Sequence, residues 1–343
     1  MNDSSLDIAY YVHHHGVGHL TRYRAISAAS SDRLHPVTEL DTDLGPTGLR
    51  LPPDCRPGND TRDPTAHGAL HWAPLAPDAL APRLARLATW LERRKPVGAV
   101  VDVSVEAVLS FRLAGLPLIA MRQHGDRSDD AHHLAHRIAE RLIAPWPVDL
   151  EDPRTPSWIV DKTDHVGFVV HRPAGGSEHS SEPIAGRDDV VVLWGSGGGS
   201  FPFDAITALA QTAAGATVHL VGHSFDGLDV PAGVRAHGWV DDVEPLLRER
   251  PVVVASAGNN TIAVAATRGC PLVVVPQSRP FDEQVAHAHR LDELEAAVVV
   301  GDPEDTDWQH AILTARTRSD RLVELTGGDG AARAAAAIHR CFR

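Results

Sequence analysis

Short apolar runs rich in β-branched residues alternate along the chain with longer stretches rich in Ala, Leu and Arg. The short runs are typical of strands buried in a parallel sheet, and the longer stretches indicate helices. Strands are predicted at residues 8–12, 37–40, 99–103, 118–122 and 142–144, and again at 190–194, 218–221, 252–254, 272–275 and 297–300. Helices are predicted at residues 21–29, 77–94, 105–114, 129–141, 243–250 and 261–268, and at about 331–343. This alternation predicts an α/β fold in which helices cover parallel sheets.

A polar run without periodicity, residues 173–187, is the predicted linker between two halves that both show this alternation. Two Rossmann-like domains are therefore expected, at residues 1–172 and 188–328, facing a central cleft at the carboxyl ends of their strands. Residues 45–82 are rich in Pro, Gly and Asp and are predicted to be largely loop. At 343 residues, the chain is long enough for two such domains.

The composition narrows the kinds of protein that fit this pattern. The 32 basic and 45 acidic residues give a net charge of −13, which argues against a nucleic-acid partner bound without regard to sequence. The three cysteines are few and widely spaced, and the N-terminus shows no basic leader followed by an apolar segment. No run approaches the roughly 18 apolar residues that a membrane span requires. We therefore expect a cytoplasmic protein without a transmembrane segment.

A turn with the features of an anion site follows the predicted strand 252–254. Gly258 allows the backbone to approach a ligand closely, and the helix that follows begins with unpaired N–H groups and a partial positive charge. Asn259, Asn260 and Thr261 have side chains that either cap this helix or bind a ligand. The turn is therefore expected to hold a phosphate or another anion.

Two further groups of polar or flexible residues follow predicted strands in the second half. Asp282, Glu283 and Gln284 offer two carboxylates and an amide, which hydrogen-bond sugar hydroxyls well. The turn after residues 190–194 is glycine-rich, which indicates either close approach to an anion or simply a tight turn. Its candidate ligand-binding residues are Ser196, with a hydroxyl donor, and Gly197 and Gly198.

A third turn, after the predicted strand 8–12, carries the candidate catalytic group. Gly16 and Gly18 allow a tight turn, and His19 lies in the first helical turn that follows. An imidazole titrates near neutral pH and is suited to taking a proton from a hydroxyl group. A helix-capping or structural role is the alternative for His19.

Clustered histidines raise the question of a metal. Consecutive residues of a regular strand point to opposite faces, so His13, His14 and His15 would not all ligate one ion if they continued the strand. His132 and His136 have helical spacing and are able to chelate. Because no carboxylate signature accompanies them, no metal is expected.

The motifs resemble a known family. The stretch 251–288, with its Gly-Asn-Asn-Thr turn, its Gly-Cys-Pro and its Asp-Glu-Gln tail, resembles the C-terminal signature of the GT-B glycosyltransferases. The likeness is greatest to the family 28 branch, which includes the lipid II-forming N-acetylglucosaminyltransferase. The Gly-x-Gly-His-x-x-Arg loop at 16–22 resembles the first loop of the same branch.

This resemblance implies a role for each motif. It implies an N-terminal acceptor domain, a C-terminal donor domain, and a final helix, 329–343, that packs back on the first domain. It also implies that His19 is the general base, that Val240 holds the nucleobase through its backbone, and that Gly16, Gly18, the two second-half turns and the Asp-Glu-Gln tail bind the donor. One position departs from the family: Val264 stands where a Glu usually holds the ribose hydroxyls, and valine accepts no hydrogen bond. The polar Asn259 and Asn260 are candidates to compensate.

The resulting functional prediction is an inverting, metal-independent glycosyltransferase. It would use a nucleotide-diphospho-sugar, most simply a UDP-sugar, and an acceptor hydroxyl, without a further cofactor. A UDP-sugar hydrolase in which His19 activates water is one alternative, since the first loop also resembles that of such hydrolases. A catalytically silent protein that binds sugar nucleotides or glycans is another, supported by Val264. Both a small-molecule acceptor and a cell-envelope acceptor stay open.

Overall fold

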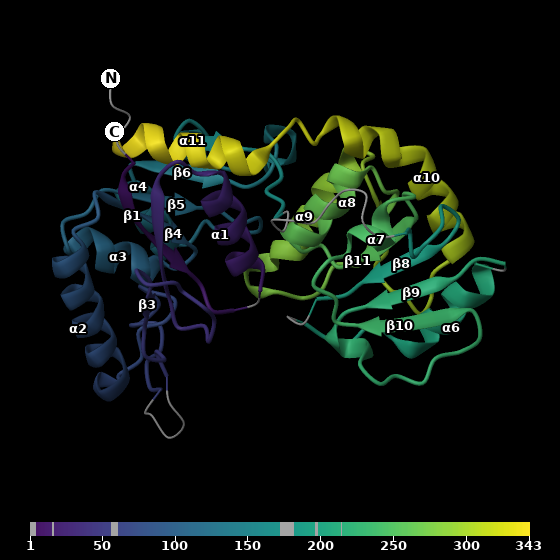
Figure 1. Ribbon diagram of the computed structural model, residues 1–343, viewed down its shortest axis with the longest axis horizontal. Helices are drawn as coiled ribbons and strands as arrows, with labels where there is room; N and C mark the ends of the chain where they lie inside the picture. Colours follow the sequence, from purple (N-terminus) through teal and green to yellow (C-terminus); the bar gives the residue numbers. More distant parts are fainter. Residues whose placement is uncertain (1–4, 16, 56–60, 172–181, 196–197, 214) are drawn as a thin grey trace.

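Two separate parallel sheets form the two lobes of the molecule in the computed structural model (Figure 1). The structure describes residues 5–15, 17–55, 61–171, 182–195, 198–213 and 215–343. The first sheet has the order β3-β2-β1-β4-β5-β6-β7 and consists of β1 (Asp7–Val12), β2 (Arg33–Thr38), β3 (Leu49–Arg50), β4 (Gly98–Asp102), β5 (Leu118–Met121), β6 (Arg141–Ala144) and β7 (Thr163–His165). The second has the order β10-β9-β8-β11-β12-β13 and consists of β8 (Val190–Leu193), β9 (Val218–Val221), β10 (Val234–Gly238), β11 (Val252–Ala255), β12 (Leu272–Val274) and β13 (Val298–Val299).

The two sheets reverse their strand order at equivalent points. In the first lobe the chain runs from β1 outward to β2 and then returns to β4 on the other side of β1. In the second lobe β8 has β9 on one side and β11 on the other. Ligands of such sheets bind where the order reverses, beyond the carboxyl ends of the strands. Parallel register brings Val12 of β1 beside Asp102 of β4, so the loop after β1 starts next to that carboxylate.

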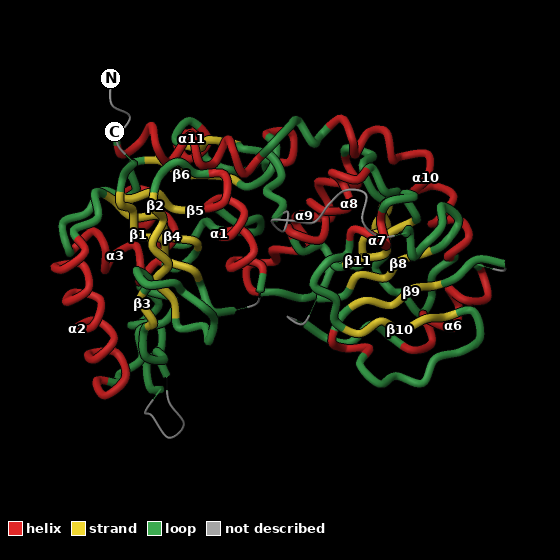
Figure 2. The backbone as a smooth tube through the Cα atoms, viewed as in Figure 1, coloured by secondary structure: helices red, strands yellow, loops and turns green. Residues whose placement is uncertain are grey.

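Helices lie on both faces of each sheet (Figure 2). On the first sheet, α1 and α11 cover one face, and α2, α3 and α4 cover the other. On the second, α6 and α10 cover one face, and α8 and α9 cover the other. Among the helices that the structure describes, none is both long and apolar enough to cross a membrane. The helices are α1 (Gly18–Ala29), α2 (Pro77–Arg94), α3 (Val105–Leu113), α4 (Asp130–Ile138), α5 (Ser157–Val160), α6 (Phe203–Thr212), α7 (Glu244–Leu247), α8 (Asn259–Arg268), α9 (Glu283–Glu293), α10 (Trp308–Glu324) and α11 (Gly330–Phe342), with 3-10 turns η1 (Val148–Leu150), η2 (His223–Phe225) and η3 (Pro280–Asp282).

The last two helices connect the lobes. Helix α10 packs on the second sheet, and α11 crosses to the first sheet, where Ala334 and Ile338 join the apolar core around Ile8 (Figure 1). The fit is close, because a Cβ atom on Gly98 of β4 would lie 2.4 Å from the ring of Phe342. The first sheet therefore obtains one of its covering layers from the far end of the chain.

The predicted fold class is confirmed, and the differences lie in individual elements. The helix predicted at 129–141 ends at Ile138, because Arg141 begins the buried strand β6. Strands β3 and β7 were not predicted, since they are only two and three residues long and β7 is polar. Strand β10 and helices α6 and α10 were not predicted either. Residues 173–181 of the predicted linker lie outside the described part of the chain.

Candidate active site

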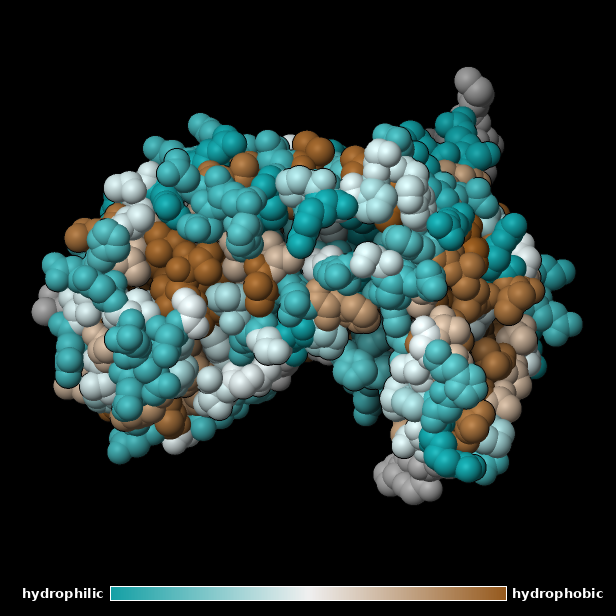
Figure 3. All heavy atoms as spheres, turned by 180° about the vertical axis from the view of Figure 1, so that it is seen from behind, coloured by the Kyte–Doolittle hydropathy of each residue, from teal (hydrophilic) through white to brown (hydrophobic). Residues whose placement is uncertain are grey.

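A cavity of about 620 Å³ lies between the lobes and is lined by residues of both. The first lobe contributes the loop after β1, the start of α1 and the ends of β4 and β5. The second lobe contributes the turn after β11, the start of α8 and the segment around η3. In a space-filling view from behind, the surface is notched between the lobes (Figure 3). The cavity thus lies where both strand orders reverse, as expected for a ligand site.

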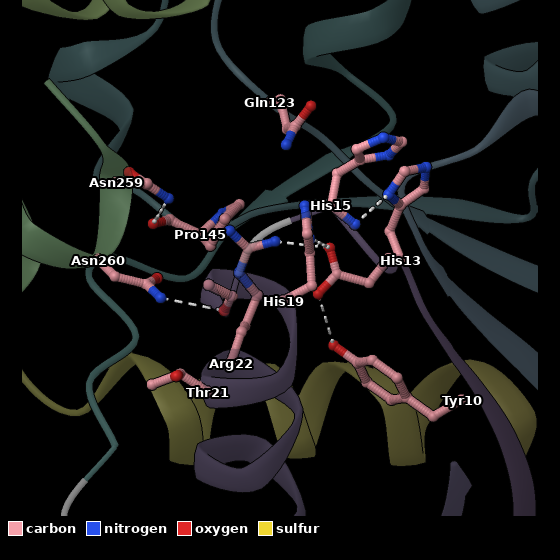
Figure 4. A network of polar contacts seen from close by, with 12 residues as sticks. Tyr10, His13, His15, His19, Thr21, Arg22, Gln123, Pro145, Asn259 and Asn260 are labelled. Carbon is pink, nitrogen blue, oxygen red and sulfur yellow. Dashed lines mark hydrogen bonds and ion pairs between the residues drawn. The ribbon is translucent and has the colours of Figure 1, made fainter. Parts of the chain in front are cut away.

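His19 lines this cavity on the first-lobe side (Figure 4) and contacts a buried carboxylate, Asp102. The Nδ1 atom of His19 lies 2.9 Å from Oδ1 of Asp102, and Nη1 of Arg22 donates to the same oxygen at 2.6 Å. The hydroxyl of Tyr10 donates to Oδ2 at 3.4 Å. Burial by itself raises the pKa of Asp102, but the charges of Arg22 and His19 outweigh it, so the pKa is lowered and the group is ionised at neutral pH.

This arrangement fixes the chemistry available to His19. A carboxylate that accepts the Nδ1 proton orients the ring and selects the tautomer in which Nε2 carries a lone pair. Nε2 is then able to accept a proton, and the resulting imidazolium is stabilised by Asp102. Asp102 was not predicted as a site residue, because it stands inside an apolar run that predicts a buried strand. The sequence feature that could have identified Asp102 as a site residue is an acidic residue at the end of a strand that pairs with β1.

The turn before α8 is open toward the cavity, and its two asparagines line the cavity and also contact the first lobe. Gly258 is the N-cap residue of α8, and within the described residues no side chain caps this helix. The capping role considered for the asparagines and Thr261 is therefore wrong. Instead, Nδ2 of Asn259 donates to the carbonyl of Pro145 at 3.2 Å, and Nδ2 of Asn260 donates to the carbonyl of Gly18 at 3.0 Å (Figure 4). The two amides bridge the lobes, while Gly258 and Thr261 line the cavity.

The Asp-Glu-Gln tail divides into three different environments. Gln284 is buried, and its Oε1 accepts the backbone N–H groups of Ala257 at 3.2 Å and Gln277 at 2.9 Å. It therefore holds the turn before α8 in place. Glu283 lines the cavity with its carboxylate 3.6 Å from Arg127 of the first lobe. Asp282 is exposed in the left-handed backbone region, with φ of 53°.

The remaining predicted donor residues lie apart from this cavity or outside the described residues. Gly16, Ser196 and Gly197 belong to the latter group. Gly198 packs against the amide of Gln277, where a Cβ atom would lie 2.2 Å from Oε1. Val240 is half-buried just beyond β10, and Val264 packs against the apolar core of the second lobe.

An exposed indole beside Val240 was not singled out in the sequence. Trp239 is 42% exposed and stacks on the ring of His223, with 4.8 Å between ring centroids and 8° between planes. Its Nε1 donates to Asp241 at 3.2 Å, which fixes the ring. The indole therefore offers a flat apolar face beyond the carboxyl end of β10.

A second set of interlobe contacts surrounds Phe281, and we refer to Gly125, Asp126, Arg127, Phe281 and Glu283 as the interlobe clasp. The carbonyl of Phe281 accepts the N–H of Asp126 at 2.7 Å, and the guanidinium of Arg127 lies 4.4 Å from the centre of the Phe281 ring. Phe281 has φ of 62°, an unfavourable value for a bulky side chain that requires such surroundings to hold it. None of these roles was predicted, because they depend on contacts between distant segments.

Three groups of side chains among the described residues are able to hold a metal ion. They are His13 with His14 and His15, His71 with Asp129 and His132, and His14 with Glu39 and Asp54. Of the helically spaced pair His132 and His136, His132 belongs to one of these groups, and His136 belongs to none of them within the described residues. The argument against His13, His14 and His15 assumed a regular strand, and that assumption is wrong because β1 ends at Val12.

One lining residue, Arg122, is held by a buried ion pair that predicts acid sensitivity. Its guanidinium donates two hydrogen bonds to Glu151, both of 2.7 Å, and His165 lies 2.7 Å from the same carboxylate. Burial alone would raise the pKa of Glu151. The hydrogen bonds from His165 and Arg122 outweigh burial, and the net result is a pKa of about 2. Because the folded pKa lies below the ordinary value of 4.5, the carboxylate stabilises the fold above pH 4.5.

We expect this contribution, about 2–3 kcal/mol, to be lost as the pH falls from about 4.5 to about 2. Urea unfolding across that range measures it, and the Glu151→Gln variant should be less stable at neutral pH and less dependent on pH below 4.5. Glu324→Gln is the control, because its pair with Arg321 is exposed and should contribute little. Equal acid dependence in Glu151→Gln and the unmodified protein would contradict the assignment.

Comparison with known sequences relates the second lobe to a described family. Residues 198–337 match the family model of the glycosyltransferase family 28 C-terminal domain. Over 182 residues, the chain is 29% identical to the UDP-N-acetylglucosamine–N-acetylmuramyl-(pentapeptide) pyrophosphoryl-undecaprenol N-acetylglucosamine transferase of Paenarthrobacter aurescens (strain TC1). The alignment covers 46% of this chain and 49% of that protein, so the chain spans about half the length of the curated relative it matches.

Comparison with solved structures concerns the whole chain. The glycotransferase of kitacinnamycin superposes with a TM-score of 0.70 at 19% identity, covering 98% of this chain and 99% of that one. The spinosyn rhamnosyltransferase complexed with thymidine diphosphate gives a TM-score of 0.69 at 17% identity, covering 97% and 100%. At such identities the likeness is one of fold. The chain therefore has the GT-B fold, and residues 198–337 are similar to the glycosyltransferase family 28 C-terminal domain, as the motifs indicated.

Proposed function

We propose that this protein is an inverting glycosyltransferase that moves a sugar from a nucleotide-diphospho-sugar to an acceptor hydroxyl. The observation that carries the proposal is the His19–Asp102 pair in one wall of the interlobe cavity, with the open start of α8 in the other. A base and an anion-binding helix end are the two groups that such a transfer requires.

In this mechanism Nε2 of His19 takes the proton of the acceptor hydroxyl as its oxygen attacks the anomeric carbon. The bond between that carbon and the diphosphate breaks on the opposite side, so the anomeric configuration inverts. Asp102 stabilises the imidazolium that forms. The backbone N–H groups at the start of α8, beside Gly258, would receive the charge of the leaving diphosphate, without a metal ion.

The donor nucleotide would lie along the second lobe. The proposed base site is the backbone of Val240 together with the exposed face of Trp239, which suits a stacked nucleobase. Val264 has no hydrogen-bond acceptor for the ribose hydroxyls. The ribose would therefore contribute less to donor binding here than it would beside a carboxylate. A UDP-sugar is the first candidate donor. A dTDP-sugar is the second, because the spinosyn rhamnosyltransferase, which has a similar fold, is complexed with thymidine diphosphate.

The first-lobe wall supports an acceptor with an apolar body. Many of its lining side chains are small or medium apolar groups, and they are accompanied by polar and charged groups such as His19, Glu106 and Arg122. We therefore propose a small-molecule acceptor with a hydroxyl at one end, in preference to a lipid-linked one. The apolar lining residues are Val101, Val103, Val105, Val108, Ala120, Met121 and Ala135.

Isothermal titration calorimetry with UDP-, dTDP- and GDP-sugars and free nucleotides tests the donor part. One nucleotide series should bind, and Gln284→Leu should weaken this binding by at least about tenfold, because the backbone N–H groups of Ala257, in the turn, and of Gln277, after β12, lose their acceptor. Val285→Ala, at the exposed neighbouring position, is the control and should bind normally. Failure of every donor to bind the unmodified protein would overturn the proposal.

Hydrolysis of the donor is the second candidate function, since His19 and Asp102 would activate a water molecule by the same proton transfer. Release of free sugar at equal rates with and without acceptors favours the hydrolase, and acceptor-dependent transfer favours the glycosyltransferase. Donor binding with neither reaction would indicate the silent binding protein that Val264 suggests.

We also propose that the protein acts in the cytoplasm, whose reducing conditions suit its few and widely spaced cysteines.

A further inference from the structure

We propose that His13, His14 and His15 form a binding site for a transition-metal ion that favours imidazole ligands, such as Zn²⁺. The three rings gather at one point after the end of β1, with centroid separations of 4.7 Å, 5.0 Å and 4.2 Å. One ligand atom from each residue lies within 4.8 Å of the other two. Neutral imidazole is among the preferred ligands of Zn²⁺, Ni²⁺ and Cu²⁺.

The path of the backbone explains how consecutive residues converge. Strand β1 ends at Val12, and the chain bends before α1 begins at Gly18, so the alternation of a strand no longer applies. A tetrahedral ion about 2.0–2.1 Å from each nitrogen needs nitrogens about 3.3 Å apart. Rotation of the side chains toward the ion therefore suffices to close the site, and two of the three residues, His13 and His15, face the cavity.

The hydrogen bonds of this cluster leave ring nitrogens for an ion. Within the described residues, the buried Nδ1 of His14 has no hydrogen-bond partner. The backbone N–H of His15 donates to Nδ1 of His13 at 3.1 Å, so an ion would be bound through the other ring nitrogen of His13. In the group of His71, Asp129 and His132, by contrast, hydrogen bonds of 3.0 Å and 2.5 Å already join the ligand atoms. The first cluster is therefore the better metal site.

Two carboxylates form a second group of possible ligands that shares His14 with the cluster. Nε2 of His14 lies 3.6 Å from Oε1 of Glu39, and Asp54 belongs to the same group of possible ligands. The other oxygen of Glu39 accepts a hydrogen bond from Arg83 at 2.7 Å, which orients the carboxylate and leaves Oε1 toward His14. An ion at this point would tie the loop after β1 to the segment after β2. Ion binding is measured without donor or acceptor, so its failure is distinguishable from a failure of sugar transfer.

The test uses untagged full-length protein, because a histidine tag would bind the same ions. Calorimetry with ZnCl₂ and the visible spectrum with Co²⁺ should report about one ion per chain in a site of low coordination number. His15→Ala, at an exposed position, and His14→Ala should each lower the affinity at least about tenfold, with folding checked by circular dichroism. His132→Ala should leave the affinity unchanged.

Two results would overturn the proposal. One is the absence of ion binding by the unmodified protein at millimolar Zn²⁺. The other is loss of binding in His132→Ala while His14→Ala and His15→Ala bind normally, which would assign the ion to the group of His71, Asp129 and His132.

Discussion

Replacing His19 with alanine is expected to lower the turnover number for sugar transfer by about 10²–10⁴-fold, while the donor dissociation constant changes little. The reason is that the imidazole is the proton acceptor in the first-lobe wall, whereas the donor would contact the second lobe. Initial rates at saturating donor and calorimetric donor binding, measured on the same preparation, separate the two effects. Arg24→Ala is the matched control, because Arg24 is an exposed residue of the same helix.

The Asp102→Asn variant tests whether the carboxylate acts through His19. Asparagine keeps the size of the side chain but loses the charge that orients Nδ1–H, so transfer should fall by a similar order. Because Arg22 would then be buried without its ion partner, thermal unfolding must show that the variant is folded at the assay temperature. Full turnover in either folded variant would remove His19 from the role of general base.

Gly125→Ala is expected to open the interlobe clasp. A Cβ atom at this position would lie 2.3 Å from the carbonyl oxygen of Phe281, and φ is +99°. The backbone would have to move, which breaks the hydrogen bond from Asp126 to Phe281. Since transfer needs groups of both lobes at one place, we expect at least a roughly tenfold loss of turnover and a larger radius of gyration in small-angle X-ray scattering.

Gly115→Ala separates the steric effect from backbone strain. Gly115 also has a left-handed φ, +87°, but within the described residues no neighbouring heavy atom lies within 4 Å of the point that a Cβ atom would occupy. Both variants bear a strain of roughly 1–2 kcal/mol, and only Gly125→Ala collides with the other lobe. Equal turnover and equal scattering of the two variants would show that the clasp does not control the distance between the lobes.

Local sequence pattern was enough for most strands of the two sheets and for the position of His19. The apolar runs of β1, β4 and β11 are long enough to mark buried strands, and the glycine turn after β1 fixed the start of α1 to within a few residues. Parallel sheets then bring such turns to one edge, so a cleft with His19 in it follows from topology alone.

The partners of individual polar side chains could not be predicted from local pattern or strand topology. Asn259 and Asn260 have the chemistry of helix caps, yet their amides bind carbonyls of Pro145 and Gly18, which are distant in sequence. Gln284 has the chemistry of a sugar ligand, yet it accepts two backbone N–H groups of its own lobe. In each case one side chain had several possible partners, and only the three-dimensional arrangement selects among them.

The crossing of α11 to the first sheet has a consequence during synthesis. The residues of β1 and β4 leave the ribosome long before residues 330–342 exist, so the apolar face around Ile8 and Val100 is covered by α1 alone at that stage, and the part that α11 will cover is open. Domains generally begin to fold from the N-terminal side as the chain emerges. The lobe that is made first is thus the one completed last, and its open face needs shielding from other chains until α11 arrives.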